Sequence, residues 1–520
     1  MSPTSLPVSS AVPGLRRNMV TICAMTATIM QALDTTIANV ALPYMQGSLS
    51  ASQDQINWVL TSYICAAAIM TAPVGWIANR FGRKRIFIIC SAGFTIASVM
   101  CGVAQNINQM VLFRLLQGVF GAALVPLSQA VMLDSYALHE RAKAMAIWGM
   151  GVMMGPIMGP SLGAWLTETY SWHWVFFVNI PFGIVTVAGL MIFMDETNKN
   201  LDLRFDWFGF LALAIGIGSL QVALDRGEQL GWLGSNEIIG EFIVAAVGFY
   251  YFFAHSFTTP KPFIQFAIFK DRNFVSGCVF MAVMGLVLYS TMALSSPYLQ
   301  NVIGYPIITA GLLLATRGSG TFVAMMLVGR LMKYIEARTL IIAGLSLTGF
   351  SLFYMTGWTD QTGVPEIVTV SIVQGFGFGL VFVPLSTVAF LTLPNHLRTD
   401  GTSMLTLMRN VASSIGISVV IAQLTEGGRR DYAILSEHIT PFNHAMQMPN
   451  VRGLIDMSSD GGRALADAMV AIQAQIIAFS QDYQLVMFFI LGSIPLAIMI
   501  GSTKVALRGQ QAAAEHAVID

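Results

Sequence analysis

Four charged residues lie inside stretches that are otherwise apolar enough to cross a lipid bilayer: Asp34, Arg114, Arg317 and Arg409. A charge in the hydrocarbon core is costly, so such residues usually pair, line water-filled cavities or relay protons. Asp34 needs water, a partner or a proton, and we interpret it as a proton carrier with Arg114 as its partner. A static ion pair, or a position at the outer membrane interface, is the alternative. Arg317 and Arg409 could take part directly in transport, but a purely structural role, paired with another polar group, explains them equally well.

Polar residues in the same apolar segments extend this candidate site. Gln117 lies three residues after Arg114, so the two side chains share one face of the predicted helix. The residues that we predict to line a substrate cavity are Gln31, Asn39, Gln117, Arg317 and Arg409.

Glycine recurs at every fourth residue of one apolar segment, at Gly151, Gly155, Gly159 and Gly163. At helical spacing these glycines remove the side chains from one helix face, so a neighbouring backbone can approach closely. Pro156 and Pro160 each remove a backbone donor, which a membrane bundle tolerates because neighbouring helices satisfy the freed carbonyls. The spacing predicts a bent, closely packed helix, and helix packing alone is enough to explain it.

A basic, glycine-containing loop is predicted between Gly75 and Arg85. Its candidate functional residues are Gly75, Asn79, Arg80, Gly82 and Arg83. Basic residues gather in the cytoplasmic loops of membrane proteins, so the loop could also be a topology signal only. A shorter version, Gly329–Lys333, follows a later apolar segment and indicates two related halves.

The composition places these residues in a polytopic membrane protein. Of the 520 residues 55% are hydrophobic and 10% are charged, whereas soluble domains carry roughly 25% charged residues. Lys plus Arg and Asp plus Glu number 27 each, so net charge does not indicate a nucleic acid or an acidic partner. The five cysteines lie in apolar runs without CxxC spacing, and neither a Walker loop nor an embedded His/Asp/Glu cluster occurs. We therefore expect no disulfide framework, metal site, cofactor, ATP-driven step or enzyme activity.

Fourteen apolar segments have the length needed to span a bilayer, which predicts an all-α integral membrane fold. They lie near 18–42, 56–78, 86–104, 109–132, 144–166, 176–194, 207–225, 237–257, 274–296, 307–331, 339–357, 366–391, 402–424 and 484–503. An even number puts both termini on one side, and most Lys and Arg residues lie in loops of that side, which indicates the cytoplasm. The expected parts are an N-terminal tail (1–17), a six-helix half (18–194), a linker with an inserted helix pair (195–272, the pair at 207–257), a second six-helix half (273–503) and a C-terminal tail (504–520).

The only long predicted loop outside the membrane runs from about 425 to 483. Within it, residues 464–480 have the pattern of an amphipathic helix, with an apolar stripe of Leu465, Met469, Ile472, Ile476 and Phe479. Such a helix can dock a partner or lie on the bilayer, and a plain tether between two spans is an equal alternative.

Together, and in this order, the motifs resemble the fourteen-helix drug:proton antiporters of the major facilitator superfamily, the EmrB/QacA type. The stretches that carry the resemblance are Leu33–Pro43 (first-helix motif), Gly75–Arg85 (motif A), Arg114–Gly121 (motif B), Gly151–Gly163 (motif C), Trp172–Gly183 and Gln374–Pro384. A finer resemblance, at Leu220–Trp232, is to the EmrB-type inner-membrane pumps of three-part efflux systems in Gram-negative bacteria.

The resemblance implies a proton-coupled efflux antiporter of two six-helix halves, which exports lipophilic or amphipathic toxic compounds by alternating access. It also implies a periplasmic adaptor and an outer-membrane channel as partners, and a place in the inner membrane. The chain departs from motif A at Asn79, where the family usually has an acid that latches the halves together. The latch is then weaker here or uses another acid. The alternative functions are proton-coupled import or export of one metabolite, and a non-transporting scaffold or sensor.

Overall fold

The computed structural model describes residues 14–499, except 138–139, 198, 202–203, 260–261, 395–396, 441, 449–454 and 456. Within these residues every regular element is a helix. Most of the predicted N-terminal tail and the whole tail 504–520 lie outside the described residues.

The helices form a first group, an inserted pair and a second group. The first group is α1 (Gly14–Ser48), α2 (Gln53–Thr71), α3 (Val74–Phe81), α4 (Arg83–Gly102), α5 (Ile107–Gly121), α6 (Leu124–Ser135), α7 (Arg141–Thr169), α8 (Trp174–Phe177) and α9 (Asn179–Phe193). The inserted pair is α10 (Trp207–Leu230) and α11 (Asn236–Thr258), joined by η2 (Trp232–Gly234). The second group is η3 (Phe266–Lys270), α12 (Arg272–Pro297), η4 (Tyr298–Val302), α13 (Ile307–Leu331), α14 (Ala337–Met355), α15 (Val364–Val388), α16 (Arg398–Ser436), α17 (His444–Gln447), α19 (Asp460–Ser493) and η6 (Ile494–Met499).

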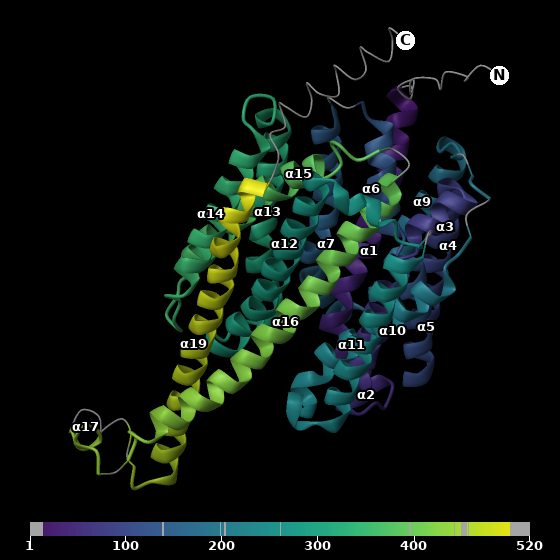
Figure 1. The fold of residues 1–520 in the computed structure, drawn as a ribbon. Helices are drawn as coiled ribbons and strands as arrows, with labels where there is room; N and C mark the ends of the chain where they lie inside the picture. Colours follow the sequence, from purple (N-terminus) through teal and green to yellow (C-terminus); the bar gives the residue numbers. More distant parts are fainter. Residues whose placement is uncertain are drawn as a thin grey trace, which may run out of the picture.

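The number of membrane-spanning helices agrees with the sequence. Thirteen helices of the described part are long and apolar enough to cross a membrane, and a bent pair, α2 with α3, makes fourteen. The two halves of this pair meet at 56°, because Pro73 at the break has no backbone N–H to continue α2. In Figure 1 α1 begins and α19 ends at the same end of the bundle, as an even number of crossings requires.

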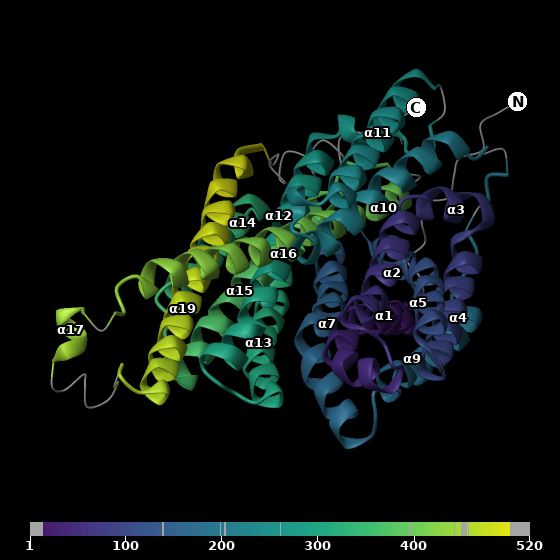
Figure 2. The same cartoon turned by 90° about the horizontal axis from the view of Figure 1, so that it is seen from below.

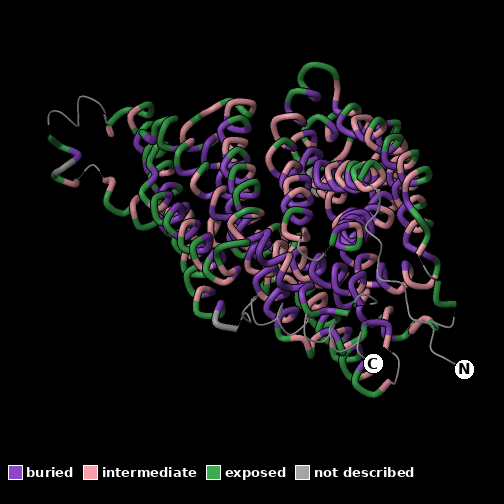
Figure 3. The backbone as a smooth tube through the Cα atoms, turned by 90° about the horizontal axis from the view of Figure 1, so that it is seen from above, coloured by how far each residue is buried: buried purple, intermediate pink, exposed green. Residues whose placement is uncertain are grey.

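The two groups of helices face each other along two seams. On one side α7 packs against α13, and on the other the inserted helix α10 packs between α2 and α16. Figure 2 shows α10 and α11 at this second seam, with the two groups on either side. Figure 3 shows buried segments both inside each group and where the groups meet, with exposed segments around the outside.

The structure confirms the helix predicted at 464–480, but this helix is not a separate element of an outer loop. Helix α16 continues to Ser436, and α19 begins at Asp460 and runs without a break to Ser493. The stretch 464–480 is therefore the first part of the last spanning helix. Figure 1 shows α16 and α19 extending together beyond the other helices, with α17 beside their far ends. We call this extension, residues 425–436 with 460–480, the arm.

The predicted apolar stripe of 464–480 is divided between core and surface. Ile476 and Phe479 are buried, because here α19 packs against the second group and the Phe479 ring lies 5.3 Å from that of Tyr298. Leu465, Met469 and Ile472 are exposed on the arm. Only these three exposed residues of the stripe are available to a partner or a bilayer.

Candidate functional site: a caged carboxylate between helices of the first group

The carboxylate of Asp34 lies at the centre of a fully buried polar cage. Arg114 Nη1 donates to its Oδ2 at 2.7 Å, Gln117 Nε2 donates to its Oδ1 at 2.8 Å, and Asn179 Nδ2 donates to Oδ1 at 3.2 Å. All four side chains have no solvent exposure. The acid and its three donors come from α1, α5 and α9, so only the tertiary packing of these helices closes the cage.

Arg114 is itself held in place from several sides. Its Nε donates to the carbonyl oxygen of Val59 at 3.0 Å, and its Nη1 also donates to Gln117 Oε1 at 2.9 Å. The guanidinium lies 4.2 Å from the ring centroid of Tyr63, within the range of a cation–π contact. A buried ion pair needs such additional partners, because desolvation otherwise exceeds the attraction between the two charges.

Asn179 is the member of the cage that sequence reasoning missed. It lies within Trp172–Gly183, a stretch that contributed to the resemblance but received no role. A polar amide at the start of a strongly apolar helix was the available signal, since buried polar groups need partners.

The glycine-rich face of α7 packs directly on α1, the helix that carries Asp34. A Cβ built on Gly155 would lie 2.1 Å from the carbonyl oxygen of Ala32, and one on Gly159 would lie 2.0 Å from Thr36 Oγ1. Thr36 Oγ1 also donates to the carbonyl oxygen of Gly155 at 2.9 Å. The close approach occurs two residues before and two residues after Asp34, so α7 sets the position of the carboxylate.

The remaining motif C residues share this packing. Cβ atoms on Gly151 and Gly163 would lie 3.0 Å from Met25 Cε and 2.8 Å from the carbonyl oxygen of Ile37. Pro156 and Pro160 lie inside α7, which stays a single helix of 29 residues.

The basic loop of motif A is mostly the short helix α3, which corrects the predicted loop. Only Gly82 forms the turn, with a φ of +96° that favours glycine. Gly75 faces the second group, since a Cβ there would lie 2.8 Å from the Cα of Asp400 on α16. Arg80 Nη1 donates to the carbonyl oxygen of Leu201 at 2.9 Å, which ties α3 to the linker.

Asp134 joins the two groups at the end of the bundle that carries the chain ends. It pairs with Arg83, which follows α3 in the first group, and it accepts from Arg398 Nη1 of the second group at 2.6 Å. Asn79 contributes no charge: its carbonyl oxygen accepts from the backbone N–H of Asn200 at 3.0 Å. The acids at this contact are therefore Asp134 and Asp400, neither of which was identified from the sequence.

The five predicted cavity residues occupy different surroundings. Gln117 belongs to the cage, Arg317 and Arg409 are buried in the second group, and Asn39 is exposed while Gln31 is half-buried. None of them lines the cavities of about 10, 450 and 850 Å³ found in the described part of the chain. Their role in binding a substrate stays a prediction.

The inserted pair contacts both groups at adjacent residues of α10. Thr61 on α2 donates to Asp225, and Ser418 Oγ on α16 donates to the carbonyl oxygen of Leu224 at 2.8 Å. The inserted helix pair is thus hydrogen-bonded to both the first and the second group.

Comparison with known proteins is consistent with this architecture. Residues 24–417 match the family described as Major Facilitator Superfamily. The chain belongs to this superfamily. It is 34% identical to the multidrug export protein EmrB of Escherichia coli K12 over 466 residues, which cover 89% of this chain and 90% of that protein. It is also 34% identical to the fatty acid resistance protein FarB of Neisseria gonorrhoeae over 426 residues, 82% of this chain and 84% of that protein.

Solved transporter structures share the fold. The human organic anion transporter MFSD10 matches with a TM-score of 0.57 and 13% identity over 91% of this chain and 99% of that one. The proton:xylose symporter XylE matches with a TM-score of 0.56 and 13% identity over 92% and 96% of the two chains. The predictions of an EmrB-type superfamily member and of an all-helical membrane fold are confirmed, and the protein is a multi-pass membrane transporter, not an enzyme.

Proposed function

We propose that this chain is a proton-coupled multidrug efflux antiporter of the inner membrane, with both termini in the cytoplasm. The observation that carries the proposal is the cage around Asp34, a carboxylate buried at membrane depth and held by a single buried cation. The relatives named for multidrug export support the class of substrate, lipophilic and amphipathic toxic compounds.

The cage gives a physical route from proton binding to movement. A proton on Asp34 removes one charge of the pair, which leaves Arg114 buried without its counter-ion. Breaking a buried pair in this way costs on the order of 3–5 kcal/mol. Reversing a two-state equilibrium from 1:99 to 99:1 takes about 5.5 kcal/mol. The free energy of breaking the Asp34–Arg114 pair is therefore most of what a switch between two orientations of the helix groups requires.

Helix α1 connects the cage to the rest of the bundle. Because Ala32 and Thr36 lie against the glycine face of α7, any adjustment of α1 is transmitted to α7 and then to α13 across the seam. The closed end, where Asp134 holds Arg83 and Arg398, would have to open for a drug to enter from the cytoplasm. Drug and proton then compete through two states of the transporter, and their coupling is reciprocal.

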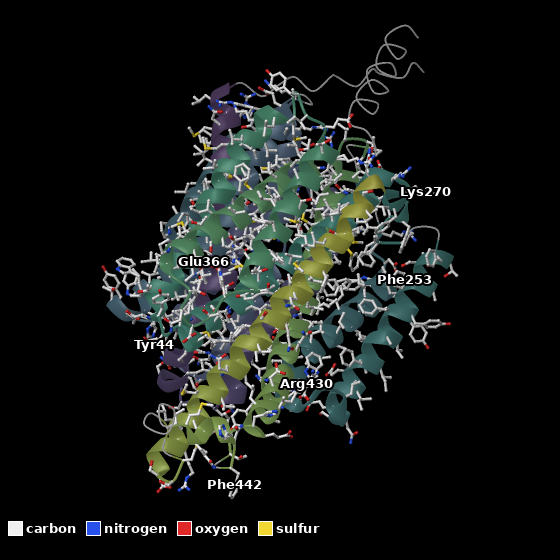
Figure 4. The ribbon with its side chains drawn as sticks, turned by 90° about the vertical axis from the view of Figure 1, so that its left-hand side faces the viewer. Tyr44, Phe253, Lys270, Glu366, Arg430 and Phe442 are labelled. Carbon is white, nitrogen blue, oxygen red and sulfur yellow. The ribbon has the colours of Figure 1, made fainter. Side chains whose placement is uncertain are left out.

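The test is transport by the purified protein in liposomes loaded with a fluorescent lipophilic cation. An acidic external buffer should drive release of the dye, and release should stop when the pH gradient is collapsed. Asp34→Asn should insert normally but lose the response to the gradient. Glu366→Gln, which removes one exposed carboxylate of α15 in the second group (labelled in Figure 4), should behave as wild type. Gradient-driven release at the wild-type rate by Asp34→Asn would refute the role of Asp34, and gradient-driven uptake would favour an importer.

We further propose that the arm docks a periplasmic adaptor that leads to an outer-membrane channel. The arm extends beyond the bundle at the end opposite the chain ends and exposes Leu465, Met469 and Ile472. Exposed apolar residues clustered on a protruding helix favour a protein interface.

A further inference from the structure

The largest of the three cavities, of about 850 Å³, lies at the end of the bundle that carries the chain ends. Trp76 and Asn79 of α3 form one wall. Asp206 and His255, at the adjacent ends of α10 and α11, form another, and Asp400 of α16 closes the third. The cavity therefore touches both helix groups and the inserted pair, and it is separate from the cage of Asp34.

The exposed charges around this cavity are positive. Arg204 and Lys270 line it, and within the described part of the chain neither side chain has a hydrogen-bond or ion-pair partner. The acids are less accessible, since Asp206 and Asp400 are both partly buried. Asp206 Oδ1 accepts from the backbone N–H of Gly209 at 2.9 Å and is bonded to His255 Nε2 at 2.8 Å. Asp400 is packed against Gly75 of α3. Two free cations at one opening favour an anionic ligand.

An aromatic path leads from the cavity to the outer surface of the inserted pair. Phe266 lines the cavity, and its ring lies 5.3 Å from that of Phe257, which lies 6.4 Å from that of Phe253. Phe257 and Phe253 are 74% and 46% exposed on α11, a membrane-spanning helix. This surface suits an alkyl chain lying beside α11 within the bilayer.

Both free cations lie at the boundary of a span. Arg204 precedes α10 by three residues and Lys270 precedes α12 by two, so their side chains reach the level of the lipid phosphates. Figure 4 shows Lys270 and Phe253 on the same flank of the molecule, with Lys270 nearer the end of the chain termini. Basic pockets between spanning helices at this level are known to hold anionic lipid headgroups.

We propose that this cavity binds the headgroup of an anionic phospholipid between Arg204 and Lys270, with an acyl chain along Phe257 and Phe253. The ligand would contact α3 of the first group, α16 of the second and the inserted pair between them. This site does not depend on the proposed direction or substrate of transport, so the two proposals can fail separately.

The test is lipid binding to the purified full-length protein in detergent, measured by native mass spectrometry. Phosphatidylglycerol and phosphatidylcholine of the same chain length are titrated separately. Wild type should bind phosphatidylglycerol about tenfold or more tightly than phosphatidylcholine. Each basic residue near an anionic surface is worth about fivefold in affinity, so Arg204→Gln with Lys270→Gln should weaken phosphatidylglycerol binding about thirtyfold.

Two further variants separate a specific site from general effects. Arg330→Gln with Lys333→Gln removes the same two charges from exposed positions at the same end of the bundle, and should leave binding unchanged. Arg204→Lys with Lys270→Arg keeps both charges and should keep the preference for phosphatidylglycerol, which guards against a folding defect in the Gln variant.

Three outcomes would overturn the proposal. They are equal affinity of the wild type for the two lipids, equal losses in the two Gln variants, and displacement of the bound lipid by millimolar inorganic phosphate. The last outcome would identify a site for a soluble anion instead of a lipid.

Discussion

Replacing Gly155 with alanine should separate α1 from α7 and weaken the cage around Asp34. A Cβ at this position would lie 2.1 Å from the carbonyl oxygen of Ala32, whereas such C···O contacts are normally about 3.3 Å or longer. The two backbones must therefore move apart by about 1 Å. The bond from Arg114 to Asp34 is 2.7 Å long, and a shift of about 1 Å takes it beyond hydrogen-bond range.

We expect Gly155→Ala to lower the free energy of unfolding by about 1–3 kcal/mol, the usual cost of overpacking a tight contact. It should also abolish most gradient-driven transport. Gly151→Ala is the matched control on the same helix face: its Cβ would lie 3.0 Å from Met25 Cε, the end of a flexible side chain that can move aside. Leucine at 155 or 159 should block transport completely.

The assay combines thermal unfolding in detergent with initial rates of dye release from liposomes. Gly163→Ala, at 2.8 Å from the carbonyl oxygen of Ile37, should fall between the two other alanine variants. Wild-type stability and flux in Gly155→Ala would refute the argument that α7 positions Asp34. Equal losses of stability and flux in Gly151→Ala and Gly155→Ala would show that the effect comes from changing α7 itself and not from its contact with Ala32.

Three further predictions follow from the other contacts. Asp134→Asn should weaken the contact through which Asp134 holds Arg83 and Arg398, and so increase thiol labelling of a cysteine introduced at Asn79. Asp195→Asn, which breaks an exposed pair with Arg16, should not increase the labelling. Equal labelling in the two variants would refute the role of Asp134 in holding the two groups together. Asn179→Ala should cost about 1–3 kcal/mol of stability, because Asp34 loses a buried donor, and unchanged thermal unfolding together with normal transport would show that Asn179 is dispensable. Serine at Leu465, Met469 and Ile472 together should abolish co-purification of an adaptor and leave transport in liposomes intact, whereas lost transport with retained adaptor would assign the arm to the transport cycle.

The sequence was sufficient for the class of fold and for the family. Whether a segment crosses a bilayer depends on its length and its mean polarity, which are properties of a continuous stretch of chain. Fourteen spanning segments were therefore predictable, whereas the bend that divides the second of them into α2 and α3 was not. The order of the short motifs was sufficient for the superfamily, and the spacing of glycines in Gly151–Gly163 predicted a face for close helix packing.

The tertiary structure decided which polar groups meet. Asn179 lies 145 residues from Asp34, and Arg398 lies 264 residues from Asp134. Such pairs depend on how each helix is rotated about its axis and how closely it crosses its neighbours, which no local pattern specifies. The same reason explains the divided stripe on α19: a three-and-four spacing identifies one face of a helix, but only the packing of α19 against Tyr298 determines where that face is buried and where it remains exposed.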